Sequence, residues 1–471
     1  MNNHTIERVE LKGIHGRYDL DISFNSSLNI LFGENGSGKS TLVHIIANIA
    51  NCDFIRFAFL KFNQITVTYS NEDYICVLQD EFEGEKIIIV TTKSGHTFEF
   101  SRREALDAAR AMEDERYDPE LAPELISKIK EFVKKYSVPI IRTSYFPAFR
   151  TMLEAWSLRA GNPNDSYIRR MHNSRLNANT PSGRATTFSR NLFGQFLPAI
   201  NYPSPVDIEI RLNDEIRRCQ LRIASYESSI FSESFVKVFS ALLEGNKNNN
   251  NDINAEGLVE EISQLANDVT NNKLRESQED SDTYSELRRL VLRNTTSRDL
   301  QSSASEALVV YRDALKQRQA YQQKAFESID IYFEVLNSFL NNKKLDYKLE
   351  KRRRDSLVGL KFPDDSWSSI KVMSSGERQL LTMLYAVNRM SDNSIVLIDE
   401  PEISLHIDWQ EDLLSKMMDQ LGDRQIIVCT HSPAIASDFR DNMTEVVPIF
   451  NDMPPSSFET LSEEEEEEDE Y

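Results

Sequence analysis

Residues Gly33 to Leu42 read GENGSGKSTL and match the pattern GxxxxGK[ST] at Gly33, Gly38, Lys39 and Ser40. Glycines at this spacing let backbone N–H groups converge on an anion at the start of a helix, whose dipole favours negative charge. The lysine can neutralise the β- and γ-phosphates, and the Ser40 hydroxyl can ligate Mg²⁺. The stretch predicts an ATP and Mg²⁺ site formed by Gly33, Asn35, Gly36, Gly38, Lys39, Ser40 and Thr41. The alternative is a glycine-rich turn without a ligand.

Two carboxylates, Asp399 and Glu400, end the apolar run that begins at Ser394. A buried parallel strand would deliver them to the edge where open α/β sheets bind ligands. Asp399 is then predicted to hold Mg²⁺, and Glu400 to orient the attacking water as a catalytic residue. Alone, the pattern also fits an ordinary strand end, but together with the glycine-rich loop it indicates ATP hydrolysis.

Two further stretches indicate a functional role only in combination with the glycine-rich loop and the acidic strand end. Ser374 and Glu377 in MSSGERQ have the spacing of a helix capping box, and a capped helix start with a glycine is also an anion site. His431 follows the apolar run Arg424–Cys429. A lone histidine in such a place is more often structural than functional.

The elements that must position these residues are buried strands and the helices that follow them. We expect strands at 28–32, 85–90, 138–141, 394–399 and 424–429, and a helix from Thr41 onward. Strand, glycine turn and helix in this order predict an α/β fold with a phosphate-binding loop.

In this order the four motifs resemble those of ABC-type and SMC-like ATPases. The resemblance makes MSSGERQ the signature motif, His431 the catalytic switch histidine, and the run from Glu400 to His406 the Walker B and D-loop. It also implies that Ser374, Ser375, Gly376 and Glu377 contact nucleotide held by a second subunit. The expected assembly is therefore a homo-oligomer built from ATP-sandwich dimers.

The long gap between the phosphate loop and the signature predicts an insertion. Residues from about Val206 to Asn342 have strongly helical composition, interrupted by the polar run 246–251, which predicts an inserted helical hairpin or short coiled coil. The expected domains are ATPase lobe I at 1–205, the hairpin region at 206–345, ATPase lobe II at 346–455 and a disordered acidic tail at 456–471.

The stretch YFPAFR at Tyr145–Arg150, with the EPE and THSP forms of the downstream motifs, resembles ATPases related to the OLD proteins. Members of that group usually continue into a Toprim nuclease, and no room for one follows His431. The resemblance is therefore to ATPase subunits of two-gene anti-phage systems, most closely the AriA family of PARIS, with the PtuA family of Septu as the rival. It implies a sensor and scaffold that holds a separately encoded nuclease and releases it on sensing a viral trigger protein.

Charge separates the alternatives. The net charge is −21, of which Glu463 to Glu470 contribute −8, so bulk binding of nucleic acid is not indicated. One local exception could receive DNA or an acidic, DNA-mimicking viral protein, or could pair with acids within the fold. It consists of Arg150, Arg159, Arg169, Arg170, Arg175, Arg184 and Arg190. A DNA-binding repair ATPase of the RecF or Rad50 type is the second hypothesis, and a transporter ATPase the third.

Smaller features complete the expectations. Four scattered cysteines give no metal or disulfide pattern, and no apolar run approaches the roughly 18 residues of a membrane span. A polar N-terminal stretch without an apolar core adds to the expectation of a cytoplasmic protein. Arg17 and Tyr18 are candidates for stacking on adenine.

Overall fold

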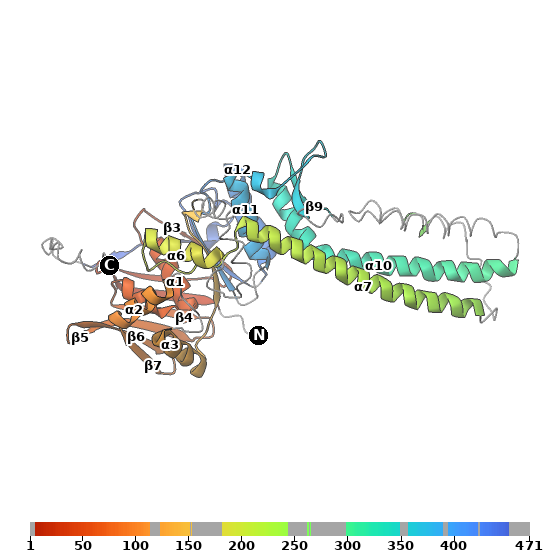
Figure 1. Cartoon of the computed structure of the whole chain (residues 1–471). Coiled ribbons are helices and arrows are strands. Elements are labelled where there is room, and N and C mark those ends of the chain that lie inside the picture. The colour runs from red at the N-terminus through yellow and green to blue at the C-terminus, as the bar shows by residue number, and fades with distance from the viewer. Residues whose placement is uncertain are drawn as a thin grey trace, which may run out of the picture. The chain divides into compact units, whose positions relative to one another are not determined.

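The computed structural model describes residues 5–113, 123–150, 152, 181–243, 261–262, 264, 298–348, 357–389, 394–422 and 424–451 (Figure 1). The chain divides into two compact units, one formed by Met1–Ser204 with Ser375–Tyr471 and the other by Pro205–Ser374. The predicted limits of lobe I, hairpin region and lobe II stay predictions, and residues 246–251 and 456–471 lie outside the described residues.

A parallel sheet forms one half of the first unit. Its strand order is β14-β3-β13-β12-β8, and all its pairs are parallel. The strands are β3 (Leu28–Phe32), β8 (Arg142–Phe146), β12 (Ser394–Asp399), β13 (Gln425–Cys429) and β14 (Met443–Glu445). Every residue of β12 and β13 is buried, because a strand covered on both faces needs an unbroken apolar run rather than alternation.

The helix after the glycine-rich loop, α1 (Lys39–Ala50), begins at Gly38 and packs against β8, β12 and β13. Its apolar residues from Leu42 to Ala50 are almost all buried. The predicted strands 28–32, 85–90, 394–399 and 424–429 and this helix are confirmed within a residue or two at their ends.

The strand predicted at 138–141 is wrong. Residues Val138 to Ile141 are irregular, and β8 begins only at Arg142. The backbone N–H groups on either side of Pro139 bond outside the sheet. Val138 N donates to Val133 O at 3.0 Å, and Ile141 N donates to Ala50 O at 2.9 Å. The sheet therefore includes Tyr145 and Phe146.

An antiparallel sheet forms the other half of this unit, in the order β15-β2-β1-β4-β5-β6-β7. Its strands are β1 (Ile6–Ile14), β2 (Tyr18–Ser23), β4 (Gln64–Tyr69), β5 (Tyr74–Phe82), β6 (Glu85–Thr92), β7 (Thr97–Ser101) and β15 (Ile449–Phe450). The burial of β4 alternates strictly, as one covered face requires. Helices α2 (Arg102–Glu113) and α3 (Glu124–Lys135) pack together beside β7.

The remaining helices of the unit are α6 (Pro181–Phe193), α11 (Ser375–Arg389) and α12 (Ile407–Leu421), with short 3₁₀ turns at Phe54–Phe59 and Arg440–Asn442. Helix α11 follows the predicted signature and packs on α12. No helix among the described residues is long and apolar enough to cross a bilayer.

The second unit is built on two long helices, α7 (Pro205–Leu243) and α10 (Arg298–Phe339) (Figure 1). They run antiparallel, because Cys219 meets Ala325, Tyr226 stacks on Tyr321 and Glu227 pairs with Arg318. A small antiparallel sheet completes the unit. It contains β9 (Lys344–Tyr347), β10 (Val358–Lys361) and β11 (Trp367–Ser368), followed by a 3₁₀ turn at Ile370–Val372. The predicted fold class, an α/β ATPase head with a helical hairpin inserted in its sequence, is confirmed.

Candidate active site

The glycine-rich loop joins β3 to α1 and surrounds the amino group of Lys39. Lys39 is only 7% exposed, and its Nζ donates to the carbonyl oxygens of Gly33 at 3.0 Å and Glu34 at 2.9 Å. Its distance to Ser37 Oγ is 3.4 Å. A buried ammonium needs oxygen partners, and here the loop supplies them. This cluster of oxygen atoms around one charge fits a group that binds phosphate.

Gly38 needs to be glycine for two reasons. Its φ of 90° lies in the left-handed region, and an added β-carbon would lie 2.5 Å from the hydroxyl oxygen of Tyr18. Tyr18 is buried, and its hydroxyl also hydrogen bonds with Thr41. A ring buried against the loop has little exposed surface for stacking on adenine, which argues against the role suggested for Tyr18. Arg17 is exposed.

Asp399 lies at the end of β12, near enough to the Ser40 hydroxyl for that hydroxyl to favour its charged form. It is 6% exposed. Burial raises its pKa to about 6, and the adjacent Glu400 charge adds to the rise, while Ser40, Arg150 and Lys39 oppose it. A hydroxyl and a buried carboxylate near each other are oxygen ligands of the kind that Mg²⁺ takes, so the residues present fit the predicted metal. The roles of both residues stay predictions.

Glu400 forms the sharp turn after β12. Its φ is 51°, a left-handed conformation that is uncommon for a residue with a side chain. Its N–H donates to Cys429 O at 2.8 Å, which ties the turn to the end of β13. The side chain is half-buried, so a carboxylate with access to water stands beside the Ser40 and Asp399 pair.

The predicted switch histidine is connected to this turn by a residue that sequence reasoning did not single out. Glu402 Oε1 accepts from the backbone N–H of His431 at 2.7 Å and of Ser432 at 3.2 Å. Ser432 Oγ in turn donates to Gln410 Oε1 at 2.7 Å. The second glutamate of the EPE stretch was the available signal for this contact, although only the fold brings it to residues so far away in sequence.

The predicted signature residues come from a different element, the start of α11. Ser374 and Ser375 are exposed, Glu377 is half-buried and Gly376 is buried. A β-carbon on Gly376 would collide with the carbonyl oxygen of Ser404. The glycine therefore lets α11 approach the turn that follows the two carboxylates.

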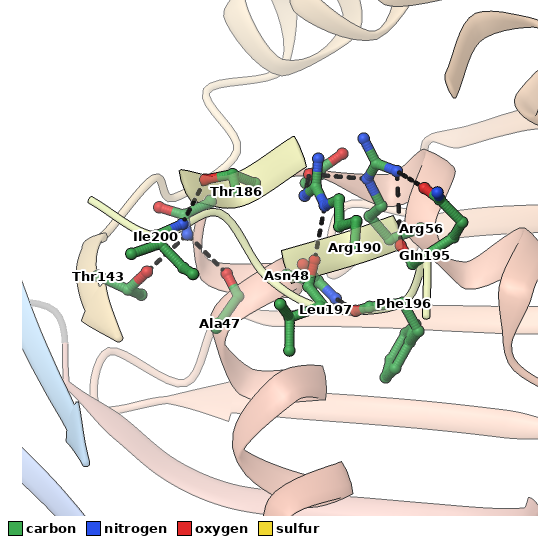
Figure 2. Close-up of polar contacts among 12 residues, drawn as sticks. Ala47, Asn48, Arg56, Thr143, Thr186, Arg190, Gln195, Phe196, Leu197 and Ile200 are labelled. Atoms are coloured by element: carbon green, nitrogen blue, oxygen red, sulfur yellow. Dashed lines mark hydrogen bonds and ion pairs between the residues drawn. The ribbon is translucent and has the colours of Figure 1, made fainter. Parts of the chain in front are cut away.

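The predicted basic field is corrected at both of its ends. Arg190 is 7% exposed and bonds to Leu197 O and to Asp53, which it shares with the fully buried Arg56. Figure 2 shows these two arginines beside Gln195, whose oxygens accept from Arg56. Nearby, Asn48 of α1 donates to Phe196 O at 2.9 Å. Arg190 of α6 thus connects Leu197 to Asp53, which follows α1, and Asn48 provides the direct bond to α1.

Arg150, at the other end, is 1% exposed and bonds to backbone carbonyls. Neither end of the segment can present charge to a partner. Arg159, Arg169, Arg170, Arg175 and the side chain of Arg184 lie outside the described residues.

A phosphate loop, an acidic strand end and a following strand, arranged on one parallel sheet, define a P-loop ATPase. The family model named AAA ATPase domain matches residues 5–436, so the chain belongs to that family and is an ATPase. A similar protein is the Retron Ec83 probable ATPase of Escherichia coli, 24% identical over 246 residues that cover 48% of this chain. The match spans 42% of that relative's length.

The similar solved structures have low sequence identity and low TM-scores. The Smc head domain of Pyrococcus furiosus with an extended coiled coil, bound to the C-terminal domain of ScpA, matches with a TM-score of 0.37 and 14% identity. That match covers 95% of this chain and 96% of the other. The Smc head domain of Pyrococcus yayanosii with a coiled coil and joint gives a TM-score of 0.34 and 14% identity, over 96% and 97% of the two chains.

Proposed function

We propose that the chain hydrolyses ATP at the edge where β3, β12 and β13 end, with Glu400 as the residue that orients the attacking water. The packing of α1 on β12, which places the Ser40 hydroxyl near enough to the Asp399 carboxylate to favour its charged form, carries this proposal. It joins the start of α1 to the end of β12, two segments that are far apart in the sequence and that supply complementary parts of one site.

Each side chain then has a distinct task. Lys39, which bonds to carbonyl oxygens of the loop, would donate to phosphate oxygens when ATP is bound, and Ser40 with Asp399 would hold Mg²⁺. Bound ATP and Mg²⁺ would supply the bond that is cleaved and the divalent charge that stabilises its oxygens. Glu400 accepts a proton from water while the left-handed turn holds its backbone, and His431 is proposed to contact the terminal phosphate.

Two substitutions separate these tasks. Lys39→Ala removes the phosphate-neutralising charge and should abolish ATP binding, whereas Glu400→Gln should bind ATP but hydrolyse it roughly 10²-fold or more slowly. Calorimetric titration with ATP and single-turnover hydrolysis measure the two properties. Equal ATP affinity in wild type and Lys39→Ala would contradict the proposed phosphate site.

We further propose that this ATPase is the sensor and scaffold subunit of an anti-phage defence complex. It would hold a separately encoded nuclease of the Toprim type and release it when a viral trigger protein binds. The resemblance to OLD-related ATPases, most closely the AriA family of PARIS and next the PtuA family of Septu, supports this. A relative whose name places it in a retron is consistent with it.

The test of the partner is co-purification of the full chain with the product of the adjacent gene. A stable complex that loses its nuclease on addition of a viral extract and ATP is expected for wild type, and a changed release is expected for Glu400→Gln. A chain that retains no partner, yet hydrolyses ATP faster when DNA is added, would instead support a repair ATPase of the RecF or Rad50 type.

A further inference from the structure

Arg150 bonds to the backbone of Asp399, the predicted Mg²⁺ ligand, and of Glu400, the predicted catalytic carboxylate. Its Nη1 donates to Asp399 O at 2.9 Å and to Pro147 O at 3.2 Å. Its Nη2 donates to Glu400 O at 2.8 Å and to Pro401 O at 3.0 Å. One guanidinium thus bonds to three consecutive carbonyl oxygens of the turn that contains Glu400.

The chemistry of these contacts suits arginine and few other residues. A guanidinium has five N–H donors in a fixed plane and no acceptor. Lysine could place one ammonium among these oxygens but could not donate hydrogen bonds in the same fixed set of directions. Arg150 is also 1% exposed and comes from the residues that follow β8, so the carbonyls it binds are anchored to the sheet by a rigid neighbour.

The turn that Arg150 binds is one that needs such support. A left-handed backbone costs a residue other than glycine roughly 1–2 kcal/mol, and Glu400 has a φ of 51°. Successive residues of a strand point to opposite faces, and this departure from extended geometry changes the direction in which Glu400 leaves the strand. Without Arg150, relaxation of the turn would redirect that carboxylate.

We propose that Arg150 is a positioning residue for hydrolysis, acting through the backbone of Glu400 and without contact with the nucleotide. The inference rests on the proposed role of Glu400 as the residue that orients water. Arg150 therefore sets the rate of the chemical step, and ATP binding, which depends on Lys39 and the phosphate loop, does not require it.

Arg190 provides a matched control, because it is also buried in the same unit and also bonds to a carbonyl, that of Leu197. We compare Arg150→Lys with Arg190→Lys. Arg150→Lys should lower kcat on the order of 10- to 100-fold, as expected for misplacing a catalytic group by about an ångström, and should leave the Kd for ATP within about threefold. Arg190→Lys should keep kcat within about threefold of wild type.

A double-substitution cycle shows whether Arg150 acts through Glu400. If it does, Arg150→Lys combined with Glu400→Gln should be no slower than Glu400→Gln alone. Multiplicative losses in the double variant would overturn the inference while leaving Glu400 in its proposed role. A wild-type rate for Glu400→Gln would instead defeat the role of Glu400, and the inference with it.

Chemical rescue covers the case in which lysine disturbs folding. Arg150→Ala leaves a space surrounded by carbonyl oxygens, and millimolar guanidinium should restore part of its lost kcat, whereas tetramethylammonium should not. A parallel fall of kcat, ATP affinity and unfolding temperature in Arg150→Lys, with no rescue of Arg150→Ala, would assign Arg150 a purely structural part.

Discussion

His44 connects the phosphate-loop helix to the neighbouring strand. Its Nε2 lies 2.7 Å from the hydroxyl of Tyr145 in β8, and burial lowers its pKa to about 4. The folded protein therefore favours neutral His44, whereas the unfolded chain takes up a proton below about 6.5. Its contribution to stability is complete above pH 6.5 and is lost as the pH falls toward 4.

We predict that the wild-type protein loses stability faster than His44→Gln as the pH is lowered from about 7 to about 5. The wild-type protein should lose roughly 1 to 2 kcal/mol more of its free energy of unfolding than His44→Gln does. The larger value applies if no water reaches the imidazole ring. Asp399, whose pKa is raised to about 6, titrates in the same range but equally in both proteins. Urea unfolding at each pH measures the difference, and parallel curves would show that His44 binds a proton as readily in the folded state as in the unfolded state.

At the scale of elements, the turn after β12 and the loop after β13 are connected through Glu402. Removing its oxygens leaves the N–H of His431 without its acceptor and takes one of two acceptors from the N–H of Ser432, which also donates to Thr430 Oγ1 at 3.0 Å. We predict that Glu402→Leu lowers kcat by roughly 10-fold, corresponding to one or two lost hydrogen bonds to a charged acceptor. Glu402→Gln keeps an acceptor oxygen at the same place and should retain most activity.

Steady-state hydrolysis of the two Glu402 variants, with ATP affinity measured beside it, checks this. An equal loss of kcat in both variants would mean that the charge of Glu402 matters and that its hydrogen bond to the backbone of His431 does not. Unchanged activity in Glu402→Leu would leave His431 without the predicted connection to the carboxylates.

Local segments could be predicted from the sequence because their signal lies within a few residues. The glycine-rich loop, β12 and β13 each combine an apolar run with a short chemical motif. The positions of Arg150 and Glu402 could not be predicted from the sequence, because their partners are backbone groups far away in sequence. For Arg150 the sequence left a basic surface and pairing within the fold as alternatives, because charge alone does not distinguish an exposed arginine from one buried among carbonyl oxygens.

The strand predicted at 138–141 failed for a related reason. Val138, Ile140 and Ile141 have strong strand propensity, but propensity does not decide which residues meet the sheet. Val138 donates its N–H to Val133 of α3, and Ile141 donates its N–H to Ala50 of α1. The next residues, Arg142 to Phe146, take the sheet position instead.

At the scale of the whole molecule, the open question is how many chains make one active site. Ser374 and Ser375 are exposed at the start of a helix, while Gly376 behind them is buried. Exposed serines at a helix start suit an anion brought by another molecule. The resemblance to ABC-type ATPases predicts that this anion is ATP held by the phosphate loop of a second copy.

The sandwich can be tested by mixing two inactive proteins. Lys39→Ala damages the phosphate loop, and Ser374→Arg blocks the signature with a bulky cation. In a mixed dimer both defects fall on one site, and the other site keeps an intact loop and an intact signature. Random exchange of subunits makes half of the dimers mixed, so we predict recovery of roughly a quarter of wild-type activity from two inactive parents. Capture of differently tagged subunits should confirm the exchange, and no recovery despite exchange would contradict a shared site.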